Sequence, residues 1–195
     1  MSGRDPIRVA VLTVSDSAVS GTRQDASGPA VRRRCEEMGW LVVKTATVPD
    51  EVNEIANPLR EWSDSGAAIL ILTTGGTGVA PRDVTPEATR SVLEREIPGL
   101  AELMRAKGLE QTRYSALSRA VAGSRKNTLI VNLPGSLKGA LFSLESIVDL
   151  VPHIIDLLAG ITGHASDAKL RTTTETLDLR ETSYEHEKPA ENRPR

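Results

Sequence analysis

The sequence predicts an α/β fold with three layers, α/β/α, in which helices cover both faces of a mainly parallel sheet. Short runs rich in Val, Leu and Ile alternate with longer segments whose apolar residues recur at helical spacing. The run at residues 7–14 has no sustained polar alternation, which is typical of a strand buried on both faces. Polar segments rich in Gly, Ser and Asp follow these runs, as expected where parallel strands end at a ligand-binding edge.

The first half of the chain is predicted to contain three strands and two helices. The strands are residues 7–14, 41–48 and 67–73. Between the first two strands, apolar residues at helical spacing indicate a helix that stops at Gly39. A second helix is predicted over residues 51–62, and Pro58 is expected to kink it or to split off its first turn.

The second half is predicted to contain more helix. Thr85 is a favourable helix start, because its hydroxyl can cap the first turn and the proline after it is tolerated there. Helical segments are expected to continue to about residue 110. A fourth strand follows at residues 128–133, and the longest apolar helix at residues 137–158, with an interruption at Pro152.

Length and composition indicate one domain with two tails. A chain of 195 residues has the usual size of a single domain, and a hydrophobic content of 39% is enough for a real core. We expect an N-terminal tail over residues 1–6 and the domain over residues 7–164. Mixed charge and few apolar residues predict a flexible C-terminal tail over residues 165–195.

Charge and composition argue against several classes of function. A net charge of -2 gives no global field toward nucleic acid or an anionic membrane, and 3% aromatic residues offer few platforms for stacked bases. The single cysteine, Cys35, cannot form an internal disulfide, and the three histidines lack zinc-ligand spacing. The short apolar run after the polar N-terminus is too brief for a signal peptide or a membrane span. We therefore expect a cytoplasmic protein with a polar, phosphate-rich ligand and no nucleic-acid or membrane partner.

Four polar segments begin where the predicted strands end. They are Ser15-Asp16, Pro49-Asp50, Thr74-Gly75-Gly76-Thr77-Gly78 and Pro134-Gly135-Ser136. The carboxyl ends of parallel strands lie on one edge of an open sheet, which is where such folds bind ligands. The sequence therefore predicts that these segments form a single site.

The segment from Thr74 to Gly78 has the chemistry of a phosphate cradle. Its glycines leave backbone N–H groups open to the oxygens of an anion. It is not a Walker P-loop, because no Gly-Lys-Ser/Thr ending follows, and Pro81 stands where a dinucleotide fingerprint has its third glycine. An ordinary glycine turn is the alternative interpretation.

Three aspartates near these segments each have a structural and a functional interpretation. Asp83 either holds Mg²⁺ beside bound phosphates or bonds backbone amides ahead of the next helix. Asp50 is either a helix N-cap or a charged ligand, and Asp16 is either a turn residue or part of the site. The cations nearest to these segments in sequence, each a candidate for neutralising phosphate, are Arg82, Arg119, Arg125, Lys126 and Lys138.

Residues 72–89, with the sequence LTTGGTGVAPRDVTPEAT, resemble the signature of the MogA/MoaB family, which also occurs in Cnx1 and gephyrin. Shorter matches are IPGL at residues 97–100, LSRA at residues 117–120 and NLPGS at residues 132–136. The likeness spans roughly residues 7–160. It implies a molybdopterin-binding fold that transfers AMP from Mg-ATP to the terminal phosphate of molybdopterin and releases pyrophosphate.

The resemblance also implies which residues perform this reaction. Asp50 and Asp83 correspond to the family's two essential aspartates and are candidate Mg²⁺ ligands. The candidate residues for binding molybdopterin and ATP are Ser15, Asp16, Thr74, Gly75, Gly76, Thr77, Gly78, Ser118, Arg119, Pro134, Gly135 and Ser136. No protein nucleophile is needed, because the pterin phosphate attacks the α-phosphorus itself and the site supplies alignment and charge neutralisation.

Two further expectations concern partners and the alternative function. Family members form trimers, or hexamers built from two trimers, and the helix over residues 137–158 is apolar on more than one face, which favours an oligomer. A molybdenum insertase is the candidate protein partner. The alternative to an enzyme is a non-catalytic, molybdopterin-binding or scaffold paralogue of the same fold, whereas nucleic-acid binding has no basic stripe to support it.

Overall fold

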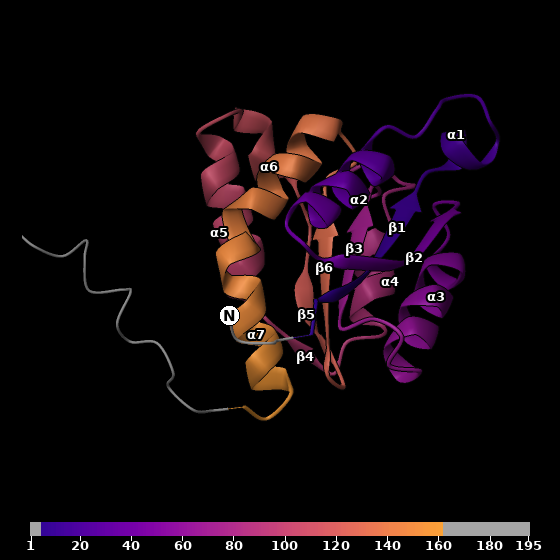
Figure 1. The fold of residues 1–195 in the computed structure, drawn as a ribbon. Coiled ribbons are helices and arrows are strands. Elements are labelled where there is room, and N and C mark those ends of the chain that lie inside the picture. Colours follow the sequence, from indigo (N-terminus) through magenta and orange to yellow (C-terminus); the bar gives the residue numbers. More distant parts are fainter. Residues whose placement is uncertain (1–4, 162–195) are drawn as a thin grey trace, which may run out of the picture. The chain divides into compact units, whose positions relative to one another are not determined.

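The computed structural model describes residues 5–161, which form a six-stranded sheet flanked by helices (Figure 1). The strands are β1 (Arg8–Val14), β2 (Leu41–Val48), β3 (Leu70–Thr74), β4 (Arg95–Glu96), β5 (Ala122–Arg125) and β6 (Thr128–Leu133). Their order in the sheet is β2-β1-β3-β6-β5-β4. The first four strands in this order pair in parallel, whereas the β6–β5 and β5–β4 pairs are antiparallel. The predicted α/β class with a mainly parallel sheet is confirmed.

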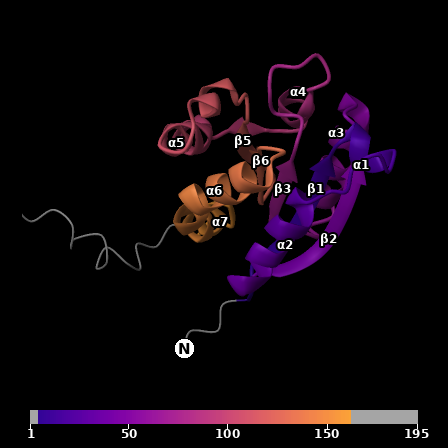
Figure 2. The same cartoon turned by 90° about the horizontal axis from the view of Figure 1, so that it is seen from above.

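Helices cover both faces of the sheet, as the view from above shows (Figure 2). The α-helices are α1 (Asp16–Val19), α2 (Ser27–Glu37), α3 (Val52–Asp64), α4 (Thr85–Arg90), α5 (Pro98–Leu109), α6 (Leu137–Ile147) and α7 (Val151–Leu158). Two 3-10 helices, η1 (Arg113–Leu117) and η2 (Val148–Leu150), complete the described elements. One hydrophobic core lies between the sheet and α2, α5, α6 and α7, and the other lies between the sheet and α3 and α4.

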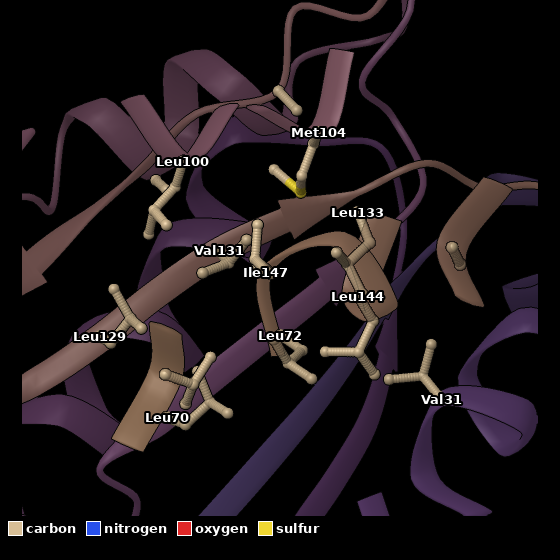
Figure 3. Close-up of a cluster of buried hydrophobic side chains, with 14 of the residues drawn as sticks. Val31, Leu70, Leu72, Leu100, Met104, Leu129, Val131, Leu133, Leu144 and Ile147 are labelled. Atoms are coloured by element: carbon tan, nitrogen blue, oxygen red, sulfur yellow. The ribbon is translucent and has the colours of Figure 1, made fainter. Parts of the chain in front are cut away.

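Alternate residues of the central strands enter opposite cores. In β1, Val9 and Val11 belong to the first core, whereas Ala10 and Leu12 belong to the second. This arrangement explains why the strand has no polar alternation, because both of its faces are buried. Figure 3 shows the first core, which includes Leu70 and Leu72 of β3, Leu129 and Val131 of β6, Leu100 and Met104 of α5, and Leu144 and Ile147 of α6.

The structure corrects several predicted helix boundaries. Pro58 does not split α3, which continues through it and buries Ile55, Leu59 and Trp62. Tertiary packing of this apolar face offsets the missing backbone hydrogen bond. Helical segments do continue from Thr85 to Leu109, as expected, but the short strand β4, which was not expected, separates α4 from α5.

The long C-terminal helix is also divided earlier than predicted. The break falls at η2, and Pro152 lies in the first turn of α7, where a proline costs little because its missing N–H has no intrahelical partner. The expected C-terminal tail over residues 165–195, and most of the expected N-terminal tail over residues 1–6, lie outside the described residues. No helix within residues 5–161 is long and apolar enough to cross a membrane.

Candidate active site

The parallel strands bring the four predicted polar segments to one edge of the sheet. Val14 at the end of β1 pairs with Val48 of β2, and Thr13 pairs with Thr74 of β3. Thr74 pairs in turn with Leu133 of β6. The segments that follow β1, β2, β3 and β6 therefore begin side by side, as the sequence predicted.

The segments after β1 and β2 are joined through two aspartates. The Asp16 amide donates to Asp50 Oδ2 at 2.8 Å, and the Asp50 amide donates to Asp16 Oδ1 at 3.0 Å. Ser15 caps the short helix α1, since its Oγ accepts from the Ala18 amide at 3.2 Å. The interpretation of Asp50 as an N-cap is wrong: Glu51 occupies that position and makes no side-chain cap bond.

Arg82 binds the Asp16 carboxylate and not that of Asp50, so the two groups differ in their electrostatic surroundings. It binds Asp16 through two nitrogens, with Nε–Oδ2 at 3.0 Å and Nη2–Oδ1 at 2.9 Å, and Glu51 through Nη1 at 2.6 Å. This pairing lowers the pKa of Asp16 below its ordinary value. The pKa of Asp50 is raised, chiefly by burial and also by the nearby Asp16 and Asp83 carboxylates. Of these two carboxylates, Asp16 already has a cationic partner, so a bound cation would stabilise the charge of Asp50 more than that of Asp16.

Two glycines of the glycine-rich segment, Gly75 and Gly76, are packed too closely against their neighbours to carry a side chain. Gly75 and Gly76 have φ of +108° and +62°, which favour glycine. A Cβ on Gly75 would collide with the Val14 carbonyl, and a Cβ on Gly76 would collide with Thr85 Oγ1 and lie 2.9 Å from Asp50 Oδ1. The backbone of this segment thus lies directly against the carboxylate of Asp50.

Other contacts hold the glycine-rich segment in this position. Thr74 Oγ1 donates to the Pro134 carbonyl at 2.8 Å, and a Cβ on Gly135 would lie 3.1 Å from Gly75 Cα. Thr85 does not cap α4, whose N-cap is Val84. Its hydroxyl instead donates to the Gly75 carbonyl at 2.9 Å, so it supports the glycine-rich segment.

Asp83 packs against the same segment two residues further along the chain. Its Oδ2 accepts from the Ala80 amide at 2.8 Å, which confirms the predicted local bond to the backbone. A Cβ on Gly78 would lie 2.7 Å from the same oxygen, so Asp83 packs against Gly78 as Asp50 packs against Gly76. Among residues 5–161, Asp83 Oδ1 and Asp50 Oδ1 make no hydrogen bond.

This arrangement of oxygens fits Mg²⁺. Asp50 and Asp83 each offer one oxygen beside the same stretch of backbone, and the Asp83 carboxylate is close enough to contribute to the raised pKa of Asp50. Within residues 5–161, no group of three or more His, Cys, Asp or Glu side chains could hold a metal alone. Mg²⁺ often takes only one or two carboxylates and completes its shell with water and phosphate oxygens, so two carboxylates beside a phosphate cradle suit it.

A cavity of about 1030 Å³ opens beside these groups. Of the predicted site residues, its wall contains Gly76, Thr77, Gly78, Asp83, Ser118, Pro134, Gly135 and Ser136. Ser15, Asp16, Asp50, Thr74, Gly75 and Arg119 do not line it. The cavity is at the upper end of the usual volume for a ligand site, so it has room for a ligand larger than a phosphate group.

Much of the cavity wall comes from elements that the strand-end argument did not consider. These elements are α5, η1 and α6, which contribute Met104, Arg105, Tyr114, Leu117, Lys138, Leu141 and Phe142. Lys138 has no ion pair among the described residues, so it is the candidate cation best placed for a phosphate. Arg125 and Lys126 instead pair with Asp64 at the opposite end of β6.

Asn132 forms a buried polar network behind the glycine-rich segment. Its Nδ2 donates to Thr73 Oγ1 at 3.0 Å and to Thr89 Oγ1 at 2.9 Å, and its Oδ1 accepts from the Val121 amide at 3.3 Å. All members of this network are buried. The network connects β6 to β3, to α4 and to the residue before β5, and these are the elements that carry the site.

Comparisons with known proteins agree with this geometry. The family described as "Probable molybdopterin binding domain" matches residues 10–153. The molybdenum cofactor synthesis protein cinnamon of Drosophila melanogaster is 44% identical over 79% of this chain, which spans only 26% of that protein. The molybdopterin adenylyltransferase of Helicobacter pylori is 39% identical, with 79% of this chain and 89% of that protein covered.

Two solved structures belong to proteins of molybdopterin biosynthesis as well. The molybdopterin biosynthesis enzyme MoaB from Thermus thermophilus is 52% identical and superposes with a TM-score of 0.75, covering 79% of this chain and 97% of that one. The Mog protein from Mycobacterium ulcerans is 38% identical, with a TM-score of 0.74 and coverage of 78% and 99%. The chain belongs to the molybdopterin-binding domain family.

Proposed function

We propose that this protein is a molybdopterin adenylyltransferase of molybdenum cofactor biosynthesis. It transfers AMP from Mg-ATP to the terminal phosphate of molybdopterin and releases pyrophosphate. The observation that carries the proposal is the position of Asp50 and Asp83 against the Gly76–Gly78 backbone, with Asp83 in the wall of the large cavity. Relatives that are named molybdopterin adenylyltransferase match over most of their own length, 86% for the Escherichia coli protein and 89% for the Helicobacter pylori protein.

The residues of the chain have separate tasks in this reaction. Gly76 and Gly78 let the backbone lie against the Asp50 and Asp83 carboxylates. The backbone N–H groups of this segment would bind phosphate oxygens, and Lys138 adds positive charge in the cavity wall. Asp50 and Asp83 would hold Mg²⁺, which neutralises phosphate charge when it is bound. Since the attacking group belongs to the substrate, the chain supplies alignment and electrostatic stabilisation.

An assay of the purified protein with ATP, Mg²⁺ and molybdopterin tests the proposal. We expect adenylylated pterin and pyrophosphate to form in equal amounts. Asp83→Asn keeps an oxygen that can accept from the Ala80 amide but removes the charge, so transfer should fall by on the order of a hundredfold. Glu54→Gln, at an exposed carboxylate of α3, is the matched control and should retain parental activity.

Two outcomes would contradict the proposal. Folded protein that binds molybdopterin but forms neither product would favour the non-catalytic binding function. Activity of Asp83→Asn within a few-fold of the parent would remove Asp83 from the reaction. We further propose that the protein acts as a trimer or a dimer of trimers and passes its product to a molybdenum insertase, since the adenylylated pterin precedes metal insertion.

A further inference from the structure

Arg119 binds both ends of the loop that carries Asp83. Its Nε donates to the Gly78 carbonyl at 2.6 Å, and its Nη2 donates to the Asp83 carbonyl. The Arg119 amide also donates to the Thr77 carbonyl at 2.8 Å. One residue thus fixes the distance between the start and the end of the loop, because a guanidinium is a rigid, planar fork.

The charge of Arg119 is balanced by Glu87. Its Nη1 and Nη2 bind the carboxylate of Glu87 in α4, with Nη2–Oε2 at 3.3 Å. All three guanidinium nitrogens therefore already donate to protein oxygens. These bonds use four of the five guanidinium N–H groups, so Arg119 could offer a phosphate only one Nη1–H without displacing an acceptor.

The main chain around Arg119 is itself held by a second arginine. Arg105 of α5 donates through Nη1 to the carbonyl of Ala120 at 3.2 Å and to that of Ser118 at 3.5 Å. These two carbonyls flank Arg119 in the chain. A series of contacts therefore runs from α5 through Arg119 to the Asp83 loop.

We infer that Arg119, paired with Glu87, is a positioning residue that fixes the Asp83 carboxylate, and not a ligand of a substrate phosphate. The inference rests on the proposed function and deepens it. Asp83 Oδ2 is bound by the Ala80 amide within the loop, so the loop ends set where Oδ1 lies. Arg119 holds those ends, whereas Lys138 lies in the cavity wall with no ion pair among the described residues.

Three variants and one matched control test this role. Arg119→Ala removes the fork, Arg119→Lys keeps the charge but cannot bridge all three acceptors, and Glu87→Gln removes the balancing charge. The control is Arg125→Lys, because Arg125 also binds a carboxylate, that of Asp64, and a carbonyl, that of Val92, but at the opposite end of β6. Hydrogen exchange of residues 77–84 and Mn²⁺ binding with α,β-methylene-ATP are measured beside kcat and KM.

In Arg119→Ala we expect faster exchange in residues 77–84, unchanged exchange in β6, and Mn²⁺ affinity and kcat reduced by about 10–100-fold, as is typical when the support of a metal ligand is lost. KM for both substrates should change little. Arg119→Lys and Glu87→Gln should give smaller losses in the same quantities. Arg125→Lys should leave all of them unchanged.

Unchanged exchange and Mn²⁺ affinity in the variants would overturn the inference. So would a KM that rises at least tenfold with kcat unchanged, because that pattern identifies a ligand of the bound substrate. If the parent protein lacks transferase activity, the proposed function fails, but exchange and Mn²⁺ binding still decide the role of Arg119. If Arg119→Ala does not fold, Arg119→Lys and Glu87→Gln decide it by the same criteria.

Discussion

Asp16 and Asp50 each accept a hydrogen bond from the other's main chain, at 2.8 Å from the Asp16 amide and at 3.0 Å from the Asp50 amide. This reciprocal pair joins the end of β1 to the end of β2. Arg82 binds the Asp16 carboxylate but not that of Asp50. The structural role of Asp50, as an acceptor, can therefore be separated from any role of its charge.

Asp50→Asn makes this separation. The amide oxygen can still accept from the Asp16 amide, so we expect the folded structure to persist. Loss of the charge should reduce adenylyl transfer by on the order of a hundredfold or more. Glu54→Gln, at an exposed carboxylate in the first turn of the following helix, is the control for neutralising a nearby charge. Equal activity of the two variants would reject the charged role of Asp50.

Asp50→Asn should also have a higher melting temperature than the parent protein at neutral pH. Burial and the neighbouring Asp16 and Asp83 carboxylates raise the pKa of Asp50. A carboxyl group whose pKa is higher in the folded than in the unfolded chain costs stability as pH rises through the interval between those values. Asn does not ionise, so the Tm of Asp50→Asn should exceed the parent's at pH 7. The difference should shrink below about pH 4, near the ordinary pKa of Asp; a difference that grows on acidification contradicts the prediction.

Gly76→Ala should cost more stability than Gly66→Ala. Both glycines have positive φ, +62° and +65°, but a Cβ on Gly66 meets nothing within 4 Å. Gly66→Ala therefore measures the backbone cost alone, about 1 kcal/mol. In Gly76→Ala the Cβ also collides with Thr85 Oγ1 and crowds Asp50. Urea denaturation gives both free energies of unfolding, and equal values would show that the glycine-rich segment relaxes without strain.

Cys35 should be unreactive in the folded protein. The side chain is fully buried in the first core, and burial raises its pKa to about 12. At pH 8 we expect no reaction with 5,5′-dithiobis(2-nitrobenzoate) until the protein is unfolded, and then one thiol per chain. Because the raised pKa belongs to the folded state, stability should also decline as pH rises above about 8.5, the ordinary thiol value. Rapid labelling of the native protein would contradict the buried position, and Cys35→Ala serves as the blank.

The C-terminal helices expose apolar side chains that an oligomer would cover. Leu150 in η2 and Leu157 in α7 are 42% and 47% exposed. We expect a trimer by light scattering at micromolar concentration and dissociation to monomers in Leu157→Glu. Val19→Glu, at an apolar residue of α1 that is 52% exposed, should leave the oligomer intact. A monomeric parent protein would contradict the proposed trimer.

The sequence was sufficient to predict the parallel part of the sheet and the edge where the site forms. Burial on both faces of β1, β3 and β6 produces continuous apolar runs, and this signal is local. The placement of Asp16, Asp50 and Gly76 at one edge then follows, because each comes directly after a predicted parallel strand. The pairing of Asp16 with Arg82 could not be predicted, because the two residues are far apart in sequence and meet only through the loop conformation.

Strand β5 shows why the sequence did not predict the antiparallel part of the sheet. Its residues Ala122, Gly123, Ser124 and Arg125 contain no apolar run, and strand propensity depends on context. Pairing with β6 through the turn at Lys126, which has a φ of +49°, makes this segment a strand. The cavity wall was missed for a related reason: Tyr114 and Phe142 come from η1 and α6, whose approach is decided by tertiary packing.

The buried amide of Asn132 also has a consequence for how the chain avoids misfolding. Asn132 pairs in register with Thr73 across β6 and β3. If β6 slipped by one residue, the amide would move to the opposite face of the sheet and leave its threonine acceptors. An unsatisfied buried polar group costs about 1–3 kcal/mol, whereas the Val, Ile and Leu residues around it would tolerate the exchange of faces far better. This one polar side chain therefore discriminates between correct and shifted strand pairing, and only the correct pairing places Pro134 beside Thr74.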